Sequence, residues 1–219
     1  MSKYIPTGKP EKELWDKASK IFEELLDDLK SKNMIRLRVI QMDINRLVEI
    51  WRNSDNLGKA FNEFNKIFDT REMPKEFAKK SGLSEATVGQ IYLSQLIGKT
   101  LIDYESVFKT SLLFFLEEEN EIRRDMTLTQ LLRAIIKISP KAGKKLRKLI
   151  DTNLRNSLAH GTFWFNSGGK VFLAKNSYLQ EVTEISLVDF MKESKRINII
   201  AHAFANTLGE KIKEGFFKI

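Results

Sequence analysis

The sequence predicts a mainly α-helical fold that begins with a helical extension and contains one small β-hairpin. Apolar residues recur at intervals of three and four along most of the chain, which is the period of an amphipathic helix. The segment from about residue 162 to residue 175 departs from this period, because β-prone residues flank a turn there. Hydrophobic residues make up 42% of the chain, which is ample for a core.

The N-terminal part of the chain predicts two amphipathic helices and a shorter third one. Apolar residues at helical spacing mark the first helix over 14–29 and the second over 37–51. The polar segment 53–58 is typical of a turn, and three phenylalanines within 61–68 mark the short helix. Pro74 then opens a new segment.

The rest of the chain predicts four further helices. A long apolar stripe covers 84–119, and a shorter helix over 127–138 ends at Ser139-Pro140. The segment 141–160 predicts one continuous helix, with Gly161 as its C-cap. A final helix covers 186–213.

The predicted hairpin lies between the last two helices. Residues 162–165 (Thr-Phe-Trp-Phe) and 170–174 (Lys-Val-Phe-Leu-Ala) are β-prone, and Asn166-Ser167-Gly168-Gly169 between them is a turn signal. Because 219 residues suit one domain with an extension, we divide the chain into an N-terminal helical region, 1–72, packing on a second domain, 73–219.

The composition limits the possible functions. A net charge of +8 favours a polyanionic partner such as nucleic acid, although a lysine-rich surface also keeps a protein soluble. The absence of cysteine excludes disulfides and thiol nucleophiles, and the presence of only two histidines, 42 positions apart, argues against a multi-histidine metal site within one chain. No run of about 18 apolar residues predicts a membrane span. We expect a cytoplasmic protein without a metal or other cofactor.

One of the two histidines lies in the most informative segment, Arg155-Asn156-Ser157-Leu158-Ala159-His160-Gly161, called the Arg–His motif below. Four polar residues share one predicted helix face at i, i+3, i+4 and i+7: Asn153, Asn156, Ser157 and His160. This stripe is uncharged and borders an apolar ridge of Leu146, Ile150, Leu154 and Leu158. The pattern predicts a half-buried face at a site or a partner interface.

The residue types of the motif suit phosphate chemistry. His160 could act as a general acid or base near neutral pH, and Arg155 could stabilise a phosphate or a phosphorane-like transition state. Asn156 could orient the imidazole or donate to a phosphate oxygen. The alternative is an ordinary helix ending, since histidine is favoured in the last turn and glycine at the cap.

The motif resembles that of the HEPN superfamily (higher eukaryotes and prokaryotes nucleotide-binding), an α-helical bundle fold. Its active members carry Arg, four to six residues, then His, commonly with Asn after Arg and with Ala-His-Gly at the end. Arg155-Asn156-x-x-Ala159-His160-Gly161 fits that form. The resemblance covers about 84–213, where the hairpin and last helix are also similar to several HEPN lineages, and it leaves 1–72 unplaced.

The resemblance implies a metal-independent endoribonuclease. Its His and Arg would act on an RNA phosphodiester attacked by the 2′-hydroxyl, giving a 2′,3′-cyclic phosphate and a 5′-hydroxyl. Two motifs from two subunits would build one composite site, so a homodimer is implied. HEPN ribonucleases commonly serve as toxins, with an antitoxin partner, or as antiviral effectors. Other HEPN proteins lack catalysis and bind nucleotide, RNA or protein, which is the first alternative.

Two further features bear on the site. Many HEPN proteins carry an acidic or polar residue on an earlier helix, and Glu105 is the candidate here, either orienting Arg155 or His160 or forming a surface pair with Lys109. The segment 126–150 holds seven basic residues and no acidic one. Five of these are candidates for RNA binding or, alternatively, for a solvated helix face: Lys141, Lys144, Lys145, Arg147 and Lys148.

A second alternative function comes from residues 77–91, which resemble a helix-turn-helix. Ser84, Thr87 and Gln90 would then face DNA. Against this interpretation, the apolar pattern continues beyond residue 91 as in a core helix, and Ser84 also fits as the N-cap of that helix.

Overall fold

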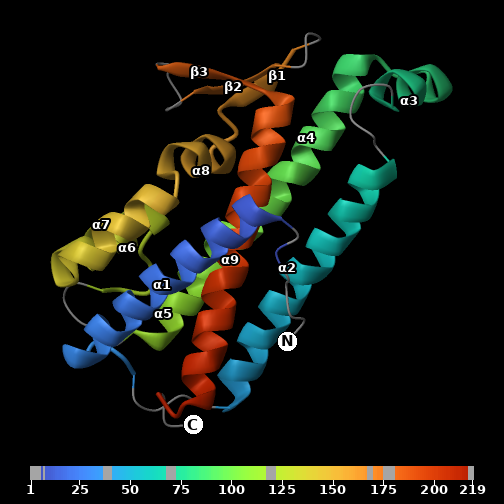
Figure 1. Cartoon of the computed structure of the whole chain (residues 1–219). Coiled ribbons are helices and arrows are strands. Elements are labelled where there is room, and N and C mark those ends of the chain that lie inside the picture. Colours follow the sequence, from blue (N-terminus) through green and yellow to red (C-terminus); the bar gives the residue numbers. More distant parts are fainter. Residues whose placement is uncertain are drawn as a thin grey trace. The chain divides into compact units, whose positions relative to one another are not determined.

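The computed structural model describes residue 6 and residues 8–36, 41–67, 73–116, 122–166, 170–174 and 181–216. It confirms a mainly helical fold with a small antiparallel sheet (Figure 1). The helices and strands have these bounds: α1 Lys9–Ser31, α2 Gln41–Ile67, α3 Met73–Ser81, α4 Glu85–Leu101, the π-helix η1 Ile102–Thr110, α5 Ser111–Phe115, α6 Leu128–Ile138, α7 Pro140–Leu149, α8 Thr152–Ala159, β1 Phe163–Phe165, β2 Lys170–Ala174, β3 Val182–Ser186 and α9 Leu187–Lys213.

The chain divides into two compact units, each built from separate stretches of sequence. Unit 1 contains residues 1–53, 103–152 and 196–219, and unit 2 contains residues 54–102 and 153–195. The predicted domain boundary after residue 72 falls outside the described residues and stays a prediction.

The core of unit 1 is centred on three phenylalanines from three helices. The ring centroids of Phe22, Phe108 and Phe204 lie 5.0–5.8 Å apart, and all three side chains are fully buried. Helix α7 packs against both α6 and α1 (Figure 1). Its contact with α6 requires a glycine, because a Cβ atom at Gly143 would lie 2.8 Å from the Cα atom of Ile136. This close packing of α6 and α7 places the lysine-rich α7 within unit 1.

Unit 2 packs the sheet against α4. A Cβ atom at Gly89 would lie 2.3 Å from the ring of Phe165, so the strand β1 covers this turn of the helix. Tyr92 is 6% exposed, and burial raises the pKa of its hydroxyl to about 12. The hydroxyl groups of Thr100 and Ser194 lie 3.1 Å apart and join α4 to the start of α9.

The sheet has the strand order β1-β2-β3, with both pairs antiparallel. Strands β1 and β2 confirm the predicted hairpin, whereas β3 was not predicted. Trp164 pairs with Phe172, which pairs in turn with Glu184 on β3. These three residues therefore share one face of the sheet.

Two predictions for residues 53–68 are wrong: the turn and the separate short helix. The segment 53–58 is helical and lies inside α2, where the ion pair of Asp55 with Lys59 (2.9 Å) and a hydrogen bond from Lys99 to the buried Ser54 (3.1 Å) stabilise it. The short third helix is the continuation of α2, and Phe68 lies outside the described residues.

The predicted helix 141–160 is two helices. Ile150 has an extended backbone (φ −109°, ψ 112°) and a side chain that is only 3% exposed, so α7 ends and α8 begins after Asp151. Because the helix breaks, the predicted apolar ridge is not continuous. Leu146 belongs to α7, whereas Leu154 and Leu158 belong to α8.

Candidate functional site

The Arg–His motif forms α8 and its C-terminal cap in unit 2. Gly161 has a φ of +65°, and its N–H donates to the Leu158 carbonyl (3.3 Å), while the N–H of Thr162 donates to the Ser157 carbonyl (3.0 Å). These two bonds form a Schellman cap, as glycine at this position predicts. His160 is therefore the last residue before the turn, with its N–H bonded to the Asn156 carbonyl (3.0 Å).

Strand β2 fixes the position of α8. The Ala174 carbonyl accepts hydrogen bonds from Ser157 Oγ (2.8 Å) and Thr162 Oγ1 (2.9 Å), and the Ala174 N–H donates to the Thr162 carbonyl (2.8 Å). Ser157 is 2% exposed and also donates to the Asn153 carbonyl (3.1 Å). Ser157 thus anchors the helix to the sheet, which is a positioning role.

Arg155 and Asn156 form a polar pair on α8. The guanidinium Nη1 of Arg155 donates to Asn156 Oδ1 at 3.0 Å, and both side chains are half-buried. Because its oxygen accepts this bond, the Asn156 amide presents its NH₂ group as a donor. The pair therefore offers guanidinium and amide donors side by side, as recognition of a phosphate requires.

The predicted polar stripe is only partly buried. Ser157 is buried, whereas Asn153 and His160 are exposed. Within the described residues, no hydrogen bond or ion pair engages the His160 imidazole. An exposed imidazole next to a fixed helix end is accessible to a ligand or to a second protein chain.

Glu105 lies on the π-helix η1 in unit 1, whereas Arg155 and His160 lie in unit 2. Its carboxylate forms an ion pair with Lys109 at 2.6 Å, and both side chains are about one-fifth exposed. This is the pair with Lys109 that the sequence suggested as the alternative to a site role. The proposed role of Glu105 in orienting Arg155 or His160 stays a prediction.

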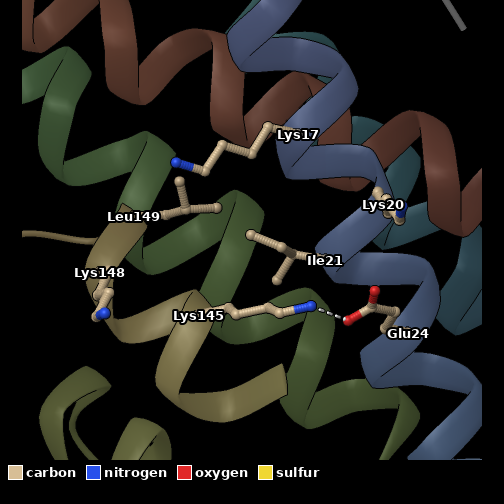
Figure 2. Close-up of a pocket in the computed structure, with 7 residues that line it drawn as sticks. All are labelled: Lys17, Lys20, Ile21, Glu24, Lys145, Lys148 and Leu149. Atoms are coloured by element: carbon tan, nitrogen blue, oxygen red, sulfur yellow. Dashed lines mark hydrogen bonds and ion pairs between the residues drawn. The ribbon is translucent and has the colours of Figure 1, made fainter. Parts of the chain in front are cut away.

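The five predicted RNA-binding residues lie on α7. Lys141, Lys144, Arg147 and Lys148 are exposed, while Lys145 is half-buried and pairs with Glu24 of α1 at 2.6 Å (Figure 2). A hydrogen bond from Lys145 lowers the pKa of the Glu24 carboxyl group below its usual value, although desolvation opposes this shift. The structure thus links α7 to α1 through a charged pair.

The sequence reasoning missed two features of these units. In unit 1, Lys17 and Lys20 of α1 line a pocket together with Lys145 and Lys148. In unit 2, the ring of Trp164 stacks on that of Phe172, with centroids 5.2 Å apart and planes within 7°. The i, i+3 spacing of the α1 lysines and the alternation along the hairpin are the signals that could have indicated them.

The region of the predicted helix-turn-helix consists of α3, a turn with Gly82 at a φ of +72°, and α4. Ser84 caps α4 by accepting from the Thr87 N–H (3.1 Å), as predicted for the alternative interpretation. Gln90 donates to the Phe165 carbonyl (3.4 Å). All three residues proposed to face DNA therefore take part in hydrogen bonds within unit 2.

The exposed apolar side chains are unevenly distributed. Within the described part of the chain, the exposed large hydrophobic side chains all belong to unit 2: Leu57, Phe77, Leu83, Ile91, Trp164, Val182 and Val188. The unit that carries the Arg–His motif therefore also carries these exposed apolar side chains.

Comparisons with models of known families, with curated proteins and with solved structures find no match for this chain. The resemblance to HEPN ribonucleases therefore rests on the residues of the Arg–His motif. No described helix is both long and apolar enough to cross a membrane. Across the same residues, no cluster of three or more His, Asp or Glu side chains could hold a metal ion.

Proposed function

We propose that the protein is a dimeric, metal-independent endoribonuclease of the HEPN type, and that it acts as a toxin or an antiviral effector. One observation carries this proposal: the Arg155–Asn156 pair on α8 and the exposed His160 in its C-terminal cap lie within one short segment, which a glycine cap and Ala174 fix in place. Fixed donors and an accessible imidazole are what transfer of a phosphoryl group requires.

The proposed reaction is an in-line transfer within the RNA. One His160 accepts the proton of the 2′-hydroxyl as its oxygen bonds to phosphorus, and a second His160 donates a proton to the 5′-oxygen as the phosphorus–oxygen bond breaks. Arg155 and Asn156 donate to the phosphoryl oxygens as negative charge builds there. The products are a 2′,3′-cyclic phosphate and a 5′-hydroxyl.

Dimerisation would supply the second histidine. His202, the other histidine of the chain, lies in unit 1, so one chain places a single histidine in the unit that carries the motif. The exposed apolar side chains of unit 2 support an interface between two copies on this unit. In this proposal the dimer completes the site, and an antitoxin could act by covering it.

The first prediction tests catalysis. The wild-type protein is expected to cleave single-stranded RNA in the presence of EDTA, and His160→Ala is expected to reduce the rate on the order of a hundredfold or more. His202→Ala is the matched control, because it removes the other histidine and is expected to retain the rate. Product ends are identified by their phosphorylation state, and circular dichroism verifies folding. Cleavage that persists in His160→Ala would refute the mechanism.

Two binding measurements separate the alternative functions. RNA binding without cleavage by the wild-type protein would identify a non-catalytic binding module. Sequence-dependent binding to duplex DNA that is lost in Thr87→Ala would identify a DNA-binding regulator. Because Thr87 is exposed and its hydroxyl lies 2.8 Å from that of Ser84, this variant keeps the backbone capping bond of α4.

A further inference from the structure

The pocket between α1 and α7 has a strongly cationic rim and an apolar floor. Its volume is about 440 Å³, and it is lined by Lys17, Lys20, Ile21, Glu24, Lys145, Lys148 and Leu149 (Figure 2). All seven residues belong to unit 1. Four ammonium groups therefore face a single carboxylate, which leaves an excess of positive charge around the pocket.

Each helix contributes two lysines at i, i+3 spacing. Lys17 and Lys20 lie on α1, and Lys145 and Lys148 lie on α7, so each pair projects from one face of its helix. Figure 2 shows the Lys17 ammonium extending over Leu149, and Lys145 reaching across the pocket towards Glu24. The positive charges thus approach the pocket from two opposing helices.

The four lysines are not equivalent. The ammonium of Lys145 is neutralised by Glu24, with which it forms a 2.6 Å ion pair. Lys17, Lys20 and Lys148 are exposed and make no ion pair or hydrogen bond with the residues that the structure describes. Three cationic side chains of this pocket are therefore available to a ligand.

The floor of the pocket is apolar. Ile21 and Leu149 are 5% and 3% exposed, and together they form the apolar surface beneath the lysines. Because Lys17, Lys20 and Lys148 are exposed, water and salt screen their attraction for an anion. The apolar floor also suits a ring or another apolar group of a ligand.

We propose that the α1–α7 pocket binds a ligand with two or more phosphate groups, held by Lys17 and Lys20 on one side and by Lys148 on the other. Two phosphate groups would let one ligand engage ammonium groups of both helices at the same time. The volume lies within the range of roughly 300–1,000 Å³ that is typical of small-molecule sites. The phosphates could belong to a free nucleoside polyphosphate or to an RNA strand. The site lies in unit 1 and does not depend on ribonuclease activity.

The second prediction tests this site by isothermal titration of the full chain carrying His160→Ala, so that RNA would stay intact. Pyrophosphate, ATP and a short single-stranded RNA are the probes, at one ionic strength. Lys17→Ala and Lys20→Ala are each expected to weaken binding of pyrophosphate and ATP by roughly three- to tenfold. Lys12→Ala is the matched control, because Lys12 is also an exposed lysine of α1 but does not line the pocket.

A second variant tests the role of Glu24. Glu24→Gln removes the negative charge and frees the Lys145 ammonium, so it is expected to tighten binding several-fold. Weaker ATP binding with unchanged RNA binding in Lys17→Ala and Lys20→Ala would identify a free nucleotide as the ligand of the pocket, whereas weaker RNA binding in these variants would identify the RNA strand. Equal losses of pyrophosphate and ATP affinity in Lys12→Ala and Lys17→Ala would overturn the proposal that this pocket binds phosphate groups. Affinity that is unchanged or weaker in Glu24→Gln would overturn it as well.

Discussion

At the scale of the residue, Gly161 determines where His160 lies. Its φ of +65° is a left-handed conformation that disfavours any side chain, although open space surrounds the position of a Cβ atom. The third prediction is that Gly161→Ala lowers the free energy of unfolding by about 1–2 kcal/mol through backbone strain alone. Because the cap also sets the position of the imidazole, RNA cleavage is expected to fall as well.

Gly98 provides the control for this prediction. It is exposed in the interior of α4, and a Cβ atom there would also meet open space, but its backbone is helical. Gly98→Ala is therefore expected to raise the free energy of unfolding by roughly 0.5–1 kcal/mol. Urea unfolding of the two variants measures both changes, and a Gly161→Ala protein as stable as Gly98→Ala would rule out a strained cap.

At the scale of the element, the pair of Glu24 and Lys145 joins α1 to α7. The hydrogen bond from Lys145 lowers the pKa of Glu24 below its usual 4.5, so the pair stabilises the folded state above that pH. The contribution disappears as the pH falls through the lowered pKa and the carboxylate takes up a proton.

The fourth prediction follows from the lowered pKa of Glu24. Wild type and Glu24→Gln are expected to differ in unfolding free energy by less than about 1 kcal/mol at neutral pH, since the pair is partly exposed. The difference is expected to shrink as the pH falls below 4.5. Glu13→Gln, an exposed position on α1, is the control and is expected to show no such change. Urea unfolding at neutral and acidic pH measures both differences.

The elements also show what the sequence can predict. The ends of α6 and α8 followed from local signals, because Thr127 forms a capping box with Gln130 and Gly161 forms the predicted cap. The break at Ile150 has no local signal, since no glycine or proline precedes α8 closely. It accompanies burial of Ile150, which depends on tertiary packing.

The candidate site also combines features that the local sequence predicts with features that depend on distant contacts. The identity of the Arg–His motif and its position at a helix end were predictable from neighbouring residues. The anchoring of Ser157 to Ala174, 17 residues away, and the pairing of Lys145 with Glu24, 121 residues away, were not. Such contacts join segments that are far apart in the sequence. Hydrophobic periodicity reports only on the structure within each segment, so it cannot predict which distant segments touch.

At the scale of the whole molecule, the proposal requires two chains for each reaction. If one His160 acts as the base and a second as the acid, a mixed dimer with one His160→Ala subunit loses one of these groups. The fifth prediction is that, when subunits exchange freely, activity falls as the square of the wild-type fraction, because only dimers of two wild-type chains keep both histidines.

His202→Ala is the control partner for this mixing experiment, since it is expected to form mixed dimers that keep both copies of His160. Activity should then follow total protein and not the wild-type fraction. Analytical ultracentrifugation establishes that dimers form at the concentrations assayed. A linear fall with His160→Ala would mean that each chain carries a complete site.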